Sequence, residues 1–285
     1  MAFTVGVVCD IGVGAALGGR DRNEDNYLLC RDGLVTYRVN DRDTRVFQPG
    51  DGVLIAVCDG MGGHTDGHVA STTAAKVLAK LYQPGLPRRP ARVLLKYIQE
   101  SHRQLHWAAR TDGPVGMGTT LTAVWMVNGQ AAWAHVGDSR LYQLRSGKLT
   151  QLTADHTRNE FARRDGRPPL PEGEHLAQNF IYGSRGLGDN AALRLEQGLD
   201  NGAEDLAAGD RYLLCSDGLT TVVDDGRIGR TLLEHDEPSA AANALRELAI
   251  DRGSRDNITA VVVRVDTVEL DASDWNEESD DTLQF

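Results

Sequence analysis

Short apolar runs that end in an acidic residue recur along this chain, and one of them constrains its fold most. Residues 53–58, Val-Leu-Ile-Ala-Val-Cys, predict a buried strand, which then turns through Asp59-Gly60-Met61-Gly62-Gly63-His64. An Asp-Gly pair at a strand end fixes a carboxylate at the edge of a sheet, and glycine lets other groups approach the backbone closely. Asp-Gly is also a common turn, so the pattern gains meaning only from its recurrence.

Four further aspartates lie against the ends of predicted strands. The runs at 130–136 and 210–215 lead into Gly137-Asp138 and Ser216-Asp217-Gly218, and two other acids directly precede the strands expected at 27–30 and 258–265. If these strand ends converge, they form an all-oxygen site, which suits Mg²⁺ or Mn²⁺ and disfavours zinc. The site would contain Asp25, Asp59, Asp138, Asp217 and Asp256.

Such a cluster favours a particular chemistry. Neighbouring carboxylates repel one another, so we expect the site to bind more than one cation. Two metal ions about 4 Å apart can share a water, lower its pKa and hold a phosphoryl oxygen for in-line attack. Arg20, close to the acids in sequence, then suits a phosphate group. The alternative is a set of unrelated turn aspartates, which is reasonable for any one acid but poor for all five with Glu24 and Arg20.

Composition narrows the class of protein. The net charge of -11 argues against nucleic acid or an acidic membrane surface as the main partner. No apolar segment approaches the roughly 20 residues that a spanning helix needs, and the N-terminus lacks the basic region of a signal peptide. The four cysteines form no Cys-x-x-Cys pair, which predicts buried reduced thiols and a cytoplasmic location.

The order of predicted elements indicates a single α/β domain over residues 1–265, in which antiparallel sheets are covered by helix pairs. Asn128-Gly129 predicts a hairpin between two of its strands. The expected strands span 3–9, 27–30, 53–58, 119–127, 130–136, 141–144, 210–215 and 258–265, and the expected helices span 67–82, 91–109, 224–235 and 238–251.

The remaining segments are polar. Residues 31–50 predict a hairpin-like excursion, with a solvated turn at 41–45, and residues 155–190 predict a surface excursion that could form a mobile flap. Residues 266–285 are acidic and without periodicity, which predicts a disordered tail. His102 and His106 have the spacing of zinc ligands but lack a third ligand nearby, so structural histidines are the favoured interpretation.

Six motifs, in this order, resemble those of the metal-dependent protein phosphatases of the 2C family, in their bacterial form. The resemblance extends from the first strand to about residue 265. The motifs are Arg20-x-x-Asn23-Glu24-Asp25, Asp59-Gly60-Met61-Gly62-Gly63-His64, Gly118-Thr119-Thr120, Gly137-Asp138-Ser139-Arg140, Ser216-Asp217-Gly218 and Asp256-Asn257.

The resemblance implies a four-layer α/β/β/α sandwich that hydrolyses phosphoserine and phosphothreonine in proteins, with a protein kinase as the natural counterpart. It implies two Mn²⁺ or Mg²⁺ ions, and in bacterial members a third. Carried over by motif, Asp59 bridges the two ions, the Gly60 carbonyl binds one, and Asp217 and Asp256 complete the other. Glu24 and Asp25 would hold metal-bound waters, Arg20 would bind the substrate phosphate, and Asp138 would support the third ion with Asp217.

Two departures from the family pattern concern catalysis and substrate contacts. Eukaryotic members place a candidate general-acid histidine where this chain has Met61, so the candidates here are the nearby His64 and a metal-bound water. The segment around 155–180, with Pro168-Pro169-Leu170-Pro171, matches no family pattern.

Three rival functions make different demands on the sequence. A cysteine phosphatase needs Cys-x5-Arg, and no cysteine of this chain has an arginine six positions later. A non-catalytic phosphoprotein-binding scaffold on the same fold is expected to have lost metal-binding acids, yet all of them are present. A small-phosphate metal hydrolase would share the metal ions and differ only in its pocket, so the sequence leaves it open.

Overall fold

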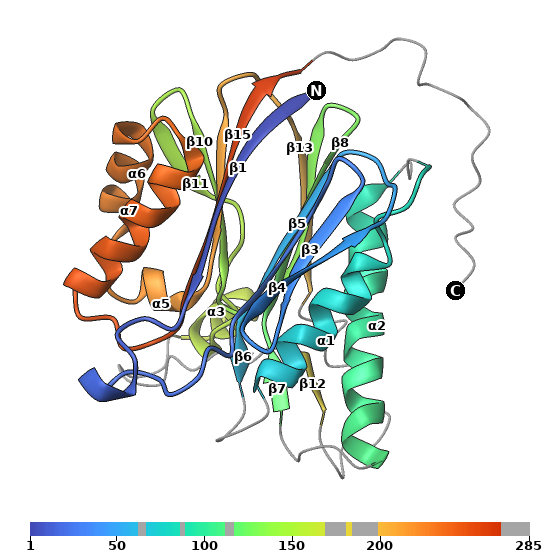
Figure 1. Cartoon of the computed structure of the whole chain (residues 1–285), viewed down its shortest axis with the longest axis vertical. Coiled ribbons are helices and arrows are strands. Elements are labelled where there is room, and N and C mark those ends of the chain that lie inside the picture. The colour runs from blue at the N-terminus through green and yellow to red at the C-terminus, as the bar shows by residue number, and fades with distance from the viewer. Residues whose placement is uncertain (62–66, 86–88, 112–116, 169–180, 184–198, 269–285) are drawn as a thin grey trace.

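The structure is a computed structural model, which describes residues 1–61, 67–85, 89–111, 117–168, 181–183 and 199–268. Two antiparallel sheets face each other at its centre (Figure 1). The smaller has five strands in the order β1 (Ala2–Asp10), β15 (Ile258–Thr267), β14 (Arg211–Cys215), β10 (Arg140–Arg145) and β11 (Lys148–Gln151).

The larger sheet has seven strands, and a small sheet of three short strands lies at one end of it. The order in the large sheet is β13 (Asp200–Asp205), β9 (Gln130–Val136), β8 (Leu121–Val127), β5 (Val53–Cys58), β2 (Asn26–Arg31), β3 (Leu34–Val39) and β4 (Arg42–Phe47). The small sheet contains β12 (Ile181–Gly183), β7 (Met117–Thr119) and β6 (Gly60–Met61).

Helices cover the outer face of each large sheet, as Figure 1 shows. Helices α1 (Gly67–Ala79) and α2 (Pro90–Thr111) pack on the seven-stranded sheet, whereas α6 (Asp225–Glu234) and α7 (Pro238–Asp251) pack on the five-stranded one. The result is the four-layer α/β/β/α sandwich that the resemblance implied. Three short helices complete the described elements: η1 (Ala15–Leu17), α3 (Arg158–Arg164) and α5 (Asp217–Thr220).

Alternation along β5 explains why its run is apolar throughout. Leu54, Ala56 and Cys58 contribute to the cluster beneath α1 and α2, and the residues between them contribute to the cluster between the two sheets. Because both faces of this strand are buried, every position is apolar and no period-2 pattern remains. Burial therefore holds the end of β5, where Asp59 follows, in a rigid environment.

Most predicted elements are present, and three expectations need correction. Residues 31–50 do contain a hairpin, formed by β3 and β4, but it is not an excursion, because both strands extend the large sheet with regular antiparallel pairing. The turn expected at 41–45 is confined to residues 40–41, and from Arg42 the chain is an exposed edge strand. The excursion at 155–190 contains α3 and β12, and its expected flap motion and Pro169-Leu170-Pro171 lie outside what the structure describes.

Smaller differences concern the ends and number of elements. Helix α1 ends at Ala79, and β11 and β13 were not predicted. The tail beyond Val268 lies outside the described residues. None of the helices that the structure describes is long and apolar enough to span a membrane.

Candidate active site

The five predicted aspartates lie at one end of the sandwich, where strands of both sheets begin or stop. Asp25 precedes β2 and Asp59 follows β5, both in the seven-stranded sheet. Asp138 lies between β9 and β10, Asp217 begins α5 just after β14, and Asp256 lies two residues before β15. Both sheets therefore contribute acids to the same site.

Burial and mutual repulsion raise the pKa of these carboxyl groups. The pKa of Asp59 lies well above its usual range, first because its carboxyl group is buried and then because it faces the other four aspartates. Burial raises the pKa of Asp138 to about 6, and the charges of Asp217 and Asp155 add to the effect. A divalent cation among these groups would reverse the effect, so their chemistry fits a hard metal ion.

Asp25 connects the two sheets through its carboxyl group. Its Oδ2 accepts hydrogen bonds of 2.7 Å from the hydroxyl groups of Ser216 and Thr259, which follow β14 and lie on β15. Burial raises the pKa of Asp25 to about 7, although these two hydrogen bonds act in the opposite direction. The carboxyl group is thus held in place by residues of the opposite sheet.

A buried pair of hydroxyl groups holds the backbone of Asp59. Its N–H donates to Thr120 Oγ1 at 2.9 Å, and the N–H of Thr120 donates to the Asp59 carbonyl at 2.9 Å. Thr120 Oγ1 also lies 2.7 Å from Ser139 Oγ, next to Asp138 in sequence. The same threonine therefore connects the segments that carry Asp59 and Asp138.

Gly60 lies where no side chain fits. A Cβ atom on Gly60 would lie 2.3 Å from the carbonyl oxygen of Gly67 and 2.5 Å from that of Glu24. The approach of these three backbone segments brings the start of α1 against the loop that carries Glu24. Packing therefore requires glycine at position 60, whatever else Gly60 does.

Arg20 and Glu24 lie at the rim of the acidic cluster. The Arg20 guanidinium forms a bidentate ion pair with Asp256, with distances of 2.7 Å from Nε to Oδ1 and 2.6 Å from Nη2 to Oδ2. The backbone N–H of Glu24 donates to Asn257 Oδ1 at 2.8 Å. Partial burial raises the pKa of Glu24, and a hydrogen bond from the Gly67 backbone opposes this.

As positioned, the acids do not yet form a coordination shell. Within the described part of the chain, no three His, Cys, Asp or Glu side chains are close enough together to hold a metal ion. Arg20 engages both carboxylate oxygens of Asp256. This ion pair would have to open before Asp256 could bind a metal ion.

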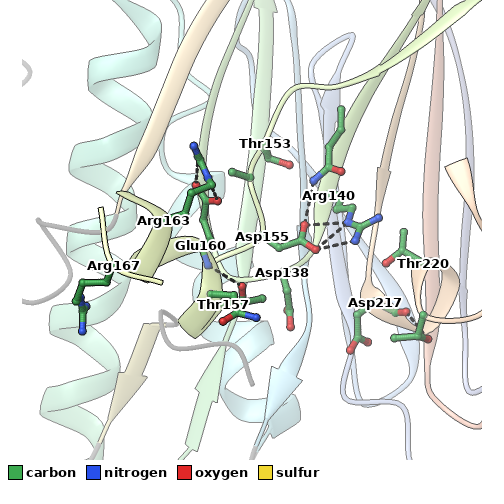
Figure 2. Close-up of a pocket in the computed structure, with 14 residues that line it drawn as sticks. Asp138, Arg140, Thr153, Asp155, Thr157, Glu160, Arg163, Arg167, Asp217 and Thr220 are labelled. Carbon is green, nitrogen blue, oxygen red and sulfur yellow. Dashed lines mark hydrogen bonds and ion pairs between the residues drawn. The ribbon is translucent and has the colours of Figure 1, made fainter. Parts of the chain in front are cut away.

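A cavity of about 1030 Å³ opens beside the cluster. Figure 2 shows Asp217 on one side of it, Glu160 of α3 on the other, and Asp138 between them. The ion pair between Arg140 and Asp155, with Nη2 and Oδ2 2.7 Å apart, also lines the cavity. The cavity is large enough for a peptide side chain to approach the acids from this direction.

A family model described as Protein phosphatase 2C matches residues 38–249. The chain belongs to the protein phosphatase 2C family. The motifs containing Arg20, Glu24, Asp25 and Asp256 lie outside the matched range, yet the structure brings them to the end where Asp59 and Asp217 lie.

Curated relatives are bacterial phosphatases. The serine/threonine protein phosphatase PstP of Mycobacterium tuberculosis is 37% identical over 217 residues, which cover 74% of this chain and 40% of PstP. The chain therefore spans less than half the length of this relative. Protein phosphatase PhpP of Streptococcus pneumoniae is 32% identical over 215 residues, covering 74% of this chain and 85% of PhpP.

A solved structure extends the similarity over nearly the whole chain. The catalytic domain of PstP, crystallised in complex with two manganese ions, matches with a TM-score of 0.71 at 30% identity. The match covers 93% of this chain and 99% of that domain.

Three residues that the sequence analysis did not identify, His156, Asp200 and Arg164, hold the turn before Asp138 in place. His156, buried at 0% exposure, accepts the N–H of Gly137 at Nδ1 (3.1 Å), and its Nε2 lies 3.1 Å from Asp200 Oδ2. Arg164 of α3 holds Asp200 through two hydrogen bonds of 3.0 and 2.6 Å. This network of a 2C-type site fixes the turn before Asp138. No sequence pattern connects His156 with Asp200, because the two lie 44 residues apart in the chain.

The other predicted features have clear outcomes. His64 lies outside the described residues, whereas Met61 is half-buried in β6. His102 is buried with its pKa lowered to about 4, and its ring stacks on His106 with centroids 6.3 Å apart. All four cysteines are free thiols, three of them buried.

Proposed function

We propose that this chain is a protein phosphatase that depends on Mn²⁺ or Mg²⁺ and removes phosphate from phosphoserine and phosphothreonine. The observation that carries the proposal is the convergence of five carboxyl groups from both sheets, with the pKa values of Asp25, Asp59, Asp138 and Asp217 raised. Membership of the 2C family and the similarity to a PstP domain that binds two manganese ions support it.

The proposed ligands follow the family motifs. Asp59 would bind both metal ions, and the Gly60 carbonyl would bind one of them. Asp217 and Asp256 would complete the other ion, and Asp138 with Asp217 would hold a third. Glu24 and Asp25 would bind waters of the ions rather than the ions themselves. The buried hydroxyl groups around Asp25 and Asp59 fit this assignment, because they hold the Asp25 carboxyl group and the Asp59 backbone in place before any ion arrives.

Residues of the chain itself would bind the substrate phosphate and donate a proton to the leaving group. Divalent ions at such a site supply an activated water and neutralise the charge of the phosphoryl group. Arg20 would release Asp256 and bind two phosphate oxygens with the same bidentate geometry. His64 is the proposed proton donor to the leaving hydroxyl group, with a water of the site as the alternative donor.

The test is hydrolysis of a phosphothreonine peptide by metal-stripped protein, with and without Mn²⁺. We expect activity only with Mn²⁺, and we expect Asp59→Asn to abolish both activity and calorimetric Mn²⁺ binding. Asp205→Asn is the matched control, because Asp205 is exposed on β13 at the far edge of the sheet. Activity that persists without metal would refute the assignment of these aspartates.

The same assay separates the two alternatives. Mn²⁺ binding without hydrolysis of any phosphopeptide would favour a phosphoprotein-binding scaffold. Hydrolysis of p-nitrophenyl phosphate but not of phosphopeptides would favour a small-phosphate hydrolase. The cavity beside Asp138 favours a peptide substrate, because it is much larger than a phosphate group.

We further propose that the catalytic domain comprises residues 1–265, that it acts in the cytoplasm and that a serine/threonine kinase supplies its substrates. The four unpaired cysteines support a reducing compartment. Cell fractionation and a phosphoproteome comparison with an Asp59→Asn strain test location and substrates together.

A further inference from the structure

The seven-stranded sheet extends beyond its five-stranded partner at the edge formed by β3 and β4. A cavity of about 750 Å³ lies there, between β1 and the inner face of β2, β3 and β4. Strand register defines this face, because Val35 and Tyr37 point to the helix layer and their neighbours point the other way. We call this face the shelf; it consists of Arg31, Leu34, Thr36, Arg38, Asp43, Arg45 and Phe47.

The shelf combines available positive charge with exposed apolar surface. Arg45 forms no hydrogen bond or ion pair with any other described residue, and Arg31 contacts only the neighbouring Asp32, which is 81% exposed. Leu34 is 38% exposed and Phe47 is 80% exposed. In a chain of net charge -11, this combination fits an acidic segment that carries an apolar side chain.

The chain contains such a segment directly after its last described strand. Residues 269–285 contain seven acids, no lysine or arginine, and Trp275. The acids are Glu269, Asp271, Asp274, Glu277, Glu278, Asp280 and Asp281.

This segment starts at the correct end of the molecule. In β15, Thr267 lies opposite Ala2, whereas Ile258, beside the acidic site, lies opposite Asp10. Strand β2 begins beside Asp25 and ends at Arg31, so Arg31 lies at the same far end as Thr267. Figure 1 shows β15 ending beside the N-terminus at this end.

Residues 269–285 are also long enough to reach the shelf. Val268 packs against the apolar cluster between the sheets, which contains Tyr27 and contacts Leu29, next to the shelf. Seventeen residues can reach roughly 56 Å when extended, whereas a six-residue strand is only about 20 Å long.

We propose that residues 269–285 bind the shelf of their own chain, with carboxylates on Arg31 and Arg45 and Trp275 over Leu34 and Phe47. Exposed ion pairs are individually weak, but attachment to β15 gives the segment a high effective concentration at the shelf. The inference is independent of catalysis.

Hydrogen exchange measured by mass spectrometry on the full chain tests the proposal. At low salt, we expect amides of residues 269–281 to exchange about fivefold slower in the wild type than in Arg31→Glu/Arg45→Glu, and 0.5 M NaCl to remove the difference. The matched control is Arg92→Glu/Arg230→Glu, which changes the net charge equally at two exposed arginines on α2 and α6. This control should keep the wild-type protection.

A charge exchange makes the test specific. Replacing Asp274, Glu277 and Glu278 by lysine should remove protection in the wild-type background and restore it in Arg31→Glu/Arg45→Glu. Unfolding temperatures show that each variant is folded. Unprotected amides in the wild type, or equal protection in the shelf variant, would overturn the proposal. Protection that rises with protein concentration would also overturn it, because the shelf would then bind a second copy.

Discussion

Replacing Asp25 by asparagine should stabilise the metal-free protein. A pKa of about 7 in the folded chain, against about 3.9 in an unfolded one, corresponds to about 4 kcal/mol of destabilisation at pH 8. The asparagine carbonyl can still accept hydrogen bonds from the hydroxyl groups of Ser216 and Thr259. Burying its NH₂ group without a hydrogen-bond partner lowers the free energy of unfolding by about 1–2 kcal/mol. The net gain in unfolding free energy is about 2–3 kcal/mol, or roughly 4–10 °C in Tm.

The gain must depend on pH in one direction. The folded-state pKa of Asp25 is raised, so its destabilising effect is fully present above about pH 7 and disappears as pH falls below about 3.9. At pH 5 the effect falls to about 1.5 kcal/mol, which the cost of the amide group offsets. Wild type and variant should therefore differ clearly at pH 8 and little at pH 5.

The assay is thermal and urea unfolding of wild type, Asp25→Asn and the exposed control Asp205→Asn in EDTA at both pH values. The control should follow the wild type. A variant that is less stable than the wild type at pH 8 would refute the reasoning, and so would a stabilisation of equal size at both pH values. Either result would mean that the ionised carboxylate of Asp25 does not destabilise the folded chain.

Three further outcomes follow from the buried groups of the site. Thr120→Val removes the hydroxyl group that accepts the Asp59 N–H, and urea unfolding should show a loss of about 1–3 kcal/mol; an unchanged midpoint would contradict this. Gly60→Ala places a methyl group 2.3 Å from the Gly67 carbonyl oxygen, so calorimetry should show weakened Mn²⁺ binding together with a lower Tm, and wild-type affinity would count against the packing argument. Burial of its sulfur, with the charge of Asp25, raises the pKa of the half-buried Cys9 thiol to about 11, so a thiol reagent at pH 8 should modify Cys9 much more slowly in the folded than in the unfolded chain, and equal labelling rates would show otherwise.

The elements that the sequence predicted well are those whose own side chains are buried. Every side chain from Val53 to Cys58 is buried on one face or the other, so the run of apolar residues is itself the consequence of position. The position of an acid at such a strand end could be predicted for the same reason, because a charged side chain is not compatible with the buried part of the strand. Their convergence came from the family resemblance, since no pattern within one strand specifies which strand ends meet.

The elements that the sequence missed depend on their neighbours. Strands β4, Arg-Asp-Thr-Arg-Val-Phe, and β13, Asp-Asn-Gly-Ala-Glu-Asp, are edge strands with mostly polar residues, and each is held by pairing with one inner strand. Ser216 and Thr259 were missed as partners of Asp25 because their role exists only once the two sheets meet. A hydroxyl group carries no pattern that reveals a partner far away in sequence.

The pairing of β1 with β15 determines when the molecule can be completed. The first strand of the chain is the edge strand of the five-stranded sheet and pairs there with β15, which begins at Ile258, so β1 has no partner strand throughout most of synthesis. Contacts of such large sequence separation slow folding and expose strand edges to aggregation. Asp256, immediately before β15, arrives equally late. A nascent chain on the ribosome therefore carries four of the five acids without a finished site, and the fifth acid and the pairing of β1 arrive together with β15.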